Sequence, residues 1–196
     1  MTLRVSAGKY SGATRARRLV GVMTAVASVA IAAVGCSTPD PVPEGEYSRV
    51  AFYDSVEALR ADSDAVIVGR AIDQEVADDI EPGFHFTLSH VEVMEGDAES
   101  GLAAGDTIVV RQVGGADTPP LTNLLGRADT YLLFLTLSGL DGRLATQFYP
   151  TGVVAGIYVA AGNDHDNVDQ LTFTQFERDE ADDLPTELTT REALGS

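Results

Sequence analysis

The chain has 196 residues, of which 44% are hydrophobic, and it carries 30 acidic residues against 13 lysines and arginines. The formal net charge of −17 at pH 7 gives a surface that repels nucleic-acid phosphates, so we expect no nucleic-acid partner. The single cysteine, Cys36, excludes both an intramolecular disulfide and a cage of cysteine metal ligands.

An export signal is predicted at residues 1–35. Five cations and no acidic residue precede an uncharged run, rich in small residues, at 19–34. This order is typical of a secretory signal peptide. The run has about 16 residues, which is shorter than the ~20 strongly apolar residues of a spanning helix, so we expect a cleaved signal rather than a permanent transmembrane anchor.

The run ends in Ala33-Val34-Gly35-Cys36-Ser37, which resembles a bacterial lipobox. The resemblance implies that Cys36 receives a diacylglycerol thioether, carries fatty acids such as palmitate, and becomes the first residue of the mature protein. Leu is usual at the position of Ala33, and the chain departs from the pattern there. The alternative is an ordinary exported protein cut at a nearby Ala-x-Ala-like site. With the lipid, the protein is expected on the extracytoplasmic face of the cell membrane.

Three further regions are predicted after the signal. Residues 36–48 contain three prolines and no periodic apolar pattern, so they are expected to form an extended linker. Residues 49–178 are long enough for one domain with its own core. Residues 179–196 are acidic and are expected to be partly flexible, with at most a marginal helix at 186–194. Loss of residues 1–35 leaves eight arginines against 30 acidic residues, a net charge of −22.

The pattern within the domain predicts one short helix followed by strands. Asp54 and Glu57 have the spacing of a capping box, with a helix to about Ala61. Gly69 favours a bulge in the first strand. In the second strand the alternation changes phase, which predicts a bulge near Ser89-His90 or burial of both faces in turn. The strands are expected at 65–76, 84–95, 107–113, 131–137, 143–149, 153–160 and 171–176.

Five to seven short strands, glycine-rich turns and one short leading helix predict an all-β fold, either a small OB-like barrel or a sandwich. The segments SDAVIVGR, VEVMEG, GDTIVV, YLLFL and YPTGVVAGIYV, in this order, resemble a family of small actinobacterial lipoproteins and secreted proteins. More distantly, they are similar to the netrin/TIMP-like branch of OB-fold barrels. That branch is rich in disulfides, and its protease inhibitors use a free N-terminal cysteine amine, which a lipidated Cys36 does not offer.

The sequence contains no Gly-x-Ser-x-Gly elbow, no His-Glu-x-x-His, no P-loop and no dinucleotide fingerprint. We therefore predict a non-enzymatic binding or adaptor domain, without a cofactor, that meets an unknown envelope protein or ligand. The alternative is an envelope hydrolase that uses His85 or His90 as a base with a carboxylate.

A second alternative is a calcium-stabilised surface module. Asp164, Asp166 and Asp169 offer hard oxygen ligands and are weak candidates for a metal site. The segment does not match an EF-hand loop, because it lacks the required glycine and the closing glutamate. A polar turn between strands is the favoured interpretation, with no metal.

Overall fold

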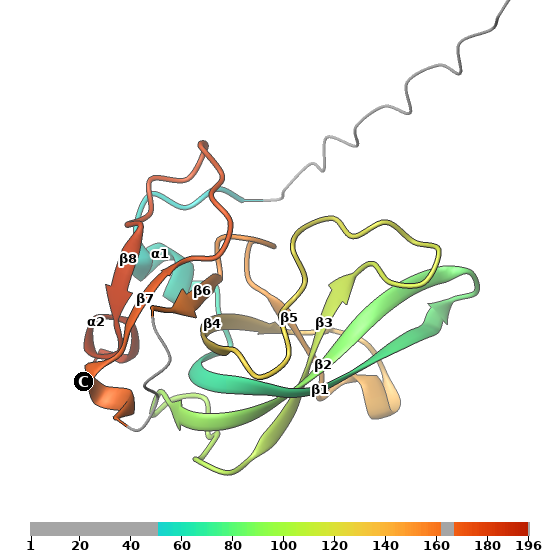
Figure 1. The fold of residues 1–196 in the computed structure, drawn as a ribbon, viewed down its shortest axis with the longest axis horizontal. Helices are drawn as coiled ribbons and strands as arrows, with labels where there is room; N and C mark the ends of the chain where they lie inside the picture. The colour runs from blue at the N-terminus through green and yellow to red at the C-terminus, as the bar shows by residue number, and fades with distance from the viewer. Residues whose placement is uncertain (1–50, 162–166, 196) are drawn as a thin grey trace, which may run out of the picture. The chain divides into compact units, whose positions relative to one another are not determined.

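The computed structural model describes residues 51–161 and 167–195 (Figure 1). The predicted signal, Cys36, the predicted linker, Asp164 and Asp166 lie outside the described residues. No helix within the described ranges is long and apolar enough to cross a membrane. The strands are β1 (Ala65–Glu81), β2 (Phe84–Gly96), β3 (Thr107–Val113), β4 (Thr130–Leu137), β5 (Phe148–Pro150), β6 (Ile157–Ala160), β7 (Thr172–Gln175) and β8 (Glu187–Thr189), and the helices are α1 (Val56–Ala61), η1 (Gly142–Leu144), η2 (Val168–Gln170) and α2 (Thr190–Leu194).

Strands β1 to β5 close into a barrel. β1 pairs antiparallel with both β2 and β4. On the two sides of this trio, β3 pairs with β2 and β5 pairs with β4. The circle closes through one parallel pair between β3 and β5, formed by Val110 and Phe148. The small all-β, OB-like barrel expected from the sequence is confirmed. β6, β7 and β8 extend the sheet from β4.

The long strand β1 bends where its register with β2 shifts. One shift falls between Val68 and Gly69, and a Cβ on Gly69 would lie 2.6 Å from Val91 Cγ1. Only glycine allows the two strands to approach this closely, so the predicted interruption at Gly69 is confirmed. A second shift leaves Ile72 without a partner between Ala71 and Asp73.

This second shift corrects the bulge predicted near Ser89-His90. It does lie opposite His90, but the extra residue belongs to β1 rather than to β2. The change of phase in β2 has the other predicted cause, because both faces of β2 are buried in turn. Leu88 is buried on one face, and Ser89 and Val91 are buried on the other.

The wall of the barrel separates two hydrophobic cores. Leu133 and Leu135 of β4 pack in the barrel interior, whereas Leu132 and Phe134 belong to a core on the outer side of the same strand. Strands β7 and β8 and both α-helices contribute to this outer core and lie grouped beside the barrel in Figure 1. Alternate residues of one apolar strand therefore serve both cores.

The last part of the chain differs from the sequence-based expectation. The sequence predicts a final strand at 171–176 and a partly flexible tail, but β8 follows and pairs with β7, and α2 begins with a complete capping box between Thr189 and Glu192. Leu184, Leu188 and Leu194 are buried in the outer core. The acidic residues around these leucines dominate the composition and conceal the apolar positions that hold the segment in place.

Three local predictions also need correction. The N-cap of α1 is Ser55 rather than Asp54, because the Ser55 hydroxyl accepts a hydrogen bond of 3.2 Å from the Ala58 N–H. The strand expected at 143–149 is shortened to β5 by the helix η1. The strand expected from Val153 begins only at β6, because residues 151–156 form turns in which Gly152 and Val153 have φ angles of 62° and 65°.

Candidate binding groove

Strands β3 and β5 separate just after their single point of contact. Val110 and Phe148 form the one residue pair between them, and β5 then continues alongside β4. The opening holds a largely apolar cavity of about 190 Å³. It is lined by Arg111, Gln112, Val113, Leu121, Thr122, Tyr149, Pro150 and Val153.

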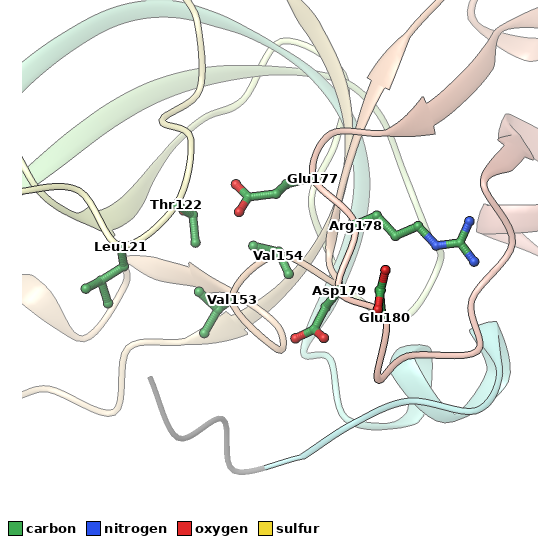
Figure 2. Close-up of a pocket in the computed structure, with 8 residues that line it drawn as sticks. All are labelled: Leu121, Thr122, Val153, Val154, Glu177, Arg178, Asp179 and Glu180. Carbon is green, nitrogen blue, oxygen red and sulfur yellow. The ribbon is translucent and has the colours of Figure 1, made fainter. Parts of the chain in front are cut away.

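A second hollow of about 370 Å³ adjoins this cavity. Leu121, Thr122 and Val153 line both hollows, so we treat the two as one continuous depression and call it the β3–β5 groove. The segment 177–180 forms the opposite wall of the second hollow (Figure 2). This segment follows β7, so the groove joins loops that are distant in the sequence.

The charged side chains of segment 177–180 differ in direction. In Figure 2 the carboxylates of Glu177 and Asp179 extend toward the side of the groove that carries Thr122 and Val153, whereas Arg178 points away from it. Glu180 is the third carboxylate in this wall. The rim of the groove is therefore acidic, and its single arginine does not face the opposite wall.

Two side chains hold the β3–β4 loop at the groove. Gln112 lies on the interior face of β3, where its Oε1 accepts a hydrogen bond of 2.9 Å from Leu125 N and its Nε2 donates one of 3.1 Å to Asn123 O. The Asn123 N–H donates to Glu177 Oε2 at 3.0 Å. These contacts place Leu121 and Thr122 between the barrel and the acidic rim.

Arg111 is the fully buried cation of the groove, with 0% of its side chain exposed. Its Nη2 lies 2.5 Å from Asp79 Oδ1, its Nη1 donates to Asp79 Oδ2 at 3.3 Å and also to Gln147, and its guanidinium lies 4.8 Å from the centre of the Phe86 ring. Hydrogen bonding to this guanidinium lowers the pKa of Asp79 below its ordinary value.

One donor of Arg111 is not used by these contacts. Nε is buried and has no hydrogen-bond partner among the described residues. A buried donor without an acceptor is unusual in a folded protein. Arg111 is therefore a buried residue of the cavity wall whose charge is neutralised by Asp79 and whose Nε–H has no acceptor among the described residues.

Val153 lies at the junction of the two hollows in a strained conformation. Its φ of 65° is in the left-handed region, which β-branched residues rarely occupy, and its N–H donates to Pro150 O at 3.1 Å. Such strain costs on the order of 1–3 kcal/mol and is concentrated at functional sites. The turn therefore keeps the partly exposed Val153 side chain at the groove in spite of an unfavourable backbone conformation.

The structure does not bring the two predicted histidines together. His85 Nδ1 lies 3.1 Å from Thr118 Oγ1, and His90 Nε2 lies 3.7 Å from Glu75 Oε1. The histidines are five residues apart on the continuous strand β2, a span of about 16 Å. Neither of them lines the β3–β5 groove.

The predicted metal ligands are described only in part. Asp169 is exposed on η2, while Asp164 and Asp166 lie outside the described residues. Burial raises the pKa of Glu95, and the charge of nearby Asp169 raises it further. Within 51–161 and 167–195, no three or more His, Cys, Asp or Glu side chains are grouped to hold a metal ion.

The groove itself was not predicted from the sequence. One signal for it was present, because Arg111 interrupts the apolar strand TIVVRQV, and a charge at such a position indicates a buried ion pair. The position of Val153 carried no such signal, since valine is expected in a strand.

No protein-family model matches the chain, and no curated protein or solved structure matches it. The resemblance to actinobacterial lipoproteins and to the netrin/TIMP-like branch therefore stays a prediction.

Proposed function

We propose that this protein is a lipid-anchored domain on the extracytoplasmic face of the cell membrane, and that it binds another polypeptide without catalysing a reaction. The observation that carries the proposal is the β3–β5 groove, a continuous depression with an apolar cavity at one end and an acidic wall at the other. Concave sites lined by apolar side chains with few polar groups are the usual form of binding sites.

The construction of the groove supports a binding role. Its walls combine strands β3 and β5 of the closed barrel with loops that those strands support, and loops held on a rigid scaffold commonly carry binding residues. Both the strained turn at Val153 and the buried Arg111 lie in these walls. The proposal includes no catalytic residue. His90 lies 3.7 Å from the Glu75 carboxylate, but neither His85 nor His90 lines the groove.

The membrane anchor is supported by the sequence alone. The basic start, the apolar run and the small residues before Cys36 agree with a lipoprotein signal. A lipid on Cys36 and a proline-containing linker allow the groove to reach partners at the envelope. One acyl chain gives only weak membrane binding, so a stable anchor needs the two or three chains of a mature lipoprotein.

The anchor is tested by mass spectrometry of the mature N-terminus, together with fractionation of Cys36→Ala. We expect a lipid-modified Cys36 in the membrane fraction and a soluble protein for the variant. A soluble, unmodified wild-type protein contradicts the proposed anchor. It does not bear on the binding groove, which has its own test.

The binding role is tested by photo-cross-linking in intact cells. A photoreactive amino acid replaces Thr122 in the groove, and in a control protein it replaces the exposed Glu99 in the loop at the opposite end of β3. We expect a reproducible adduct of defined mass from position 122 that position 99 does not give. No adduct from position 122, or the same adducts from both positions, contradicts the proposal.

A further inference from the structure

We propose that strand β1 binds an extended polypeptide as an additional strand along Gln74 and Val76, and that this polypeptide carries basic residues on either side of an apolar one. Its main chain pairs with Gln74 and Val76, its apolar side chain lies beside Val76, and a basic side chain lies beside Glu75. This surface is separate from the β3–β5 groove, so the inference goes beyond the proposed function.

Strand β1 has a neighbouring strand on one side only after Ala71. Ala71 N donates to Asp129 O at 3.2 Å, and Ala71 O accepts from Ala128 N at 2.7 Å. Within the described residues, no main-chain hydrogen bond on the β4 side of β1 follows these two, and β1 then pairs with β2 alone. In Figure 1 the hairpin of β1 and β2 extends away from β6, β7 and β8. Residues 73–81 therefore form an open edge of the sheet, and we call them the β1 edge.

Two contacts at the ends of β2 fix the direction of its main chain. Val93 N donates to Asp106 O at 2.8 Å, and His85 O accepts from Gly114 N at 3.0 Å. Both contacts lie on the β3 side, and the register between β2 and β3 has no shift between them. Main-chain groups alternate between the two sides of a strand, so the odd-numbered residues of β2 face β3 and the even-numbered residues face β1.

The same alternation leaves the main chain of Gln74 and Val76 directed outward. Glu75 and Ala77 pair with even-numbered residues of β2, so their N–H and C=O groups face β2. Gln74 and Val76 have the opposite direction, and no main-chain group of the described residues bonds to them on that side. Gln74 contacts the β3–β4 loop through its side chain, which donates to Leu125 O. Donors and acceptors that alternate along an open strand match another extended chain.

The side chains of the β1 edge indicate the chemistry of the added strand. Val76 is apolar and 50% exposed. Residues 72–81 include five acidic residues and no lysine, arginine or histidine. An apolar residue opposite Val76 removes its exposed surface from water, and basic residues on either side complement the acidic ones.

Several of these carboxylates are available to a basic partner. Asp78 and Glu81 are exposed and form no ion pair within the described part of the chain. Glu75 lies 3.7 Å from His90, but 64% of its side chain is exposed. Charge complementarity of this kind steers a basic segment to the edge and fixes its register.

A second copy of this chain fits the β1 edge less well than a basic segment does. Two such edges side by side bring two acidic rows together, and like charges opposite each other destabilise a strand pair. Each copy also carries a net charge of −17. The acidic residues therefore oppose pairing between copies, whereas they favour pairing with a basic chain.

Hydrogen exchange of single main-chain amides tests the proposal. The full-length chain in detergent is studied by NMR, alone and with a blocked peptide of sequence Lys-Val-Lys-Val-Lys. Without the peptide, we expect the amides of Gln74 and Val76 to exchange about tenfold faster than those of Glu75 and Ala77, which already face β2. With the peptide, we expect exchange at Gln74 and Val76 to slow by about tenfold, and this protection to weaken as salt is raised.

Two variants and a second peptide provide the controls. Val76→Pro removes an outward N–H and leaves the bonds to β2, because proline is tolerated where its nitrogen faces away from the neighbouring strand. We expect this variant to lose the protection of Gln74, and we expect Val76→Ile, which keeps the N–H and the apolar side chain, to retain it. The matched Glu-Val-Glu-Val-Glu peptide should protect neither residue. Circular dichroism confirms that both variants are folded.

Three results overturn this inference: unchanged exchange with the lysine peptide, equal protection by the glutamate peptide, or protection of Gln74 in Val76→Pro. The acidic residues would then serve only to keep the edge unpaired. Protection without peptide that increases with protein concentration would identify a second copy as the occupant and would also overturn the inference. Val76 lines neither hollow of the groove, so these results leave the cross-link from position 122 as the separate test of the proposed function.

Discussion

Arg111 and Asp79 form a buried ion pair in which Nη2 and Oδ1 are 2.5 Å apart, and the pair joins strand β3 to the far end of β1. Removing the carboxylate leaves a buried guanidinium without its counter-charge, so we expect Asp79→Asn to lower the free energy of unfolding by ~3–5 kcal/mol. Urea denaturation measures this change. The matched control is Asp73→Asn, because Asp73 and Arg127 form an exposed pair for which we expect a loss of at most ~1 kcal/mol.

The same pair predicts how stability depends on pH. Hydrogen bonding to Arg111 lowers the pKa of Asp79 in the folded state, so the stabilising effect of the pair is complete above the unfolded pKa of about 4 and is lost as the pH falls through the folded pKa. The difference in stability between wild type and Asp79→Asn should be constant from pH 5 to 8 and should shrink below about pH 4. A difference that stays constant to pH 2 contradicts this account.

For Glu95 we expect stability to depend on pH in the opposite direction from that expected for Asp79. Burial and the nearby Asp169 raise its pKa above the ordinary value, so its charged form costs stability once the pH exceeds the unfolded pKa. We expect Glu95→Gln to raise the melting temperature at pH 7 by a small amount and to lose this advantage as the pH falls below about 4. The exposed neighbour Glu92 provides the control, since Glu92→Gln should change little. A lower melting temperature for Glu95→Gln at pH 7 would count against the burial of this carboxylate.

The C-terminal segment is expected to contribute to the stability of the domain. Leu188 of β8 is 5% exposed and pairs with Phe173, so we expect Leu188→Ala to cost ~2–5 kcal/mol. Its exposed neighbour in the same strand, Glu187, is the control, and Glu187→Ala should stay within ~0.5 kcal/mol of wild type. Equal unfolding curves for the two variants would mean that residues 187–189 do not pack as β8.

Val153 predicts a gain in stability together with a loss of binding. Asparagine tolerates the left-handed region better than valine does, so Val153→Asn should raise stability by about 1 kcal/mol. It also removes an apolar side chain from the groove and should weaken the photo-cross-link from position 122. The same substitution at the adjacent Val154, which is buried and lacks a positive φ, should lower stability instead. Destabilisation by both variants would argue against strain at Val153.

Local patterns were sufficient to predict the first four strands, because alternation and β-branched residues act over neighbouring positions. The bend at Gly69 was predictable for the same reason. Local patterns were insufficient to predict β8, because the acidic residues around Leu184 and Leu188 have the composition of a flexible tail. Only the long-range packing of these two leucines in the outer core shows otherwise. The cap of α1 was misplaced by one residue, because Asp54 and Ser55 are both good N-caps.

The groove depends on pairings between distant parts of the chain. Leu121, Val153 and Glu177 lie in three separate loops that meet only after β5 has closed the barrel beside β3 and β7 has joined β6. No spacing or periodicity in the sequence connects these positions. Only Arg111, a charge within an apolar strand, offered a local indication of the site.

The most direct test of the binding groove is cross-linking from its rim in intact cells, with the groove open or filled. A photoreactive residue at position 180 should give a defined adduct with another envelope polypeptide in the wild-type background. The same adduct should form with Leu137→Trp, a control at an exposed leucine of β4 outside the groove. The adduct should disappear with Leu121→Trp, because this substitution fills the groove without changing the rim. An adduct that persists with Leu121→Trp would contradict the assignment of the β3–β5 groove as the binding site.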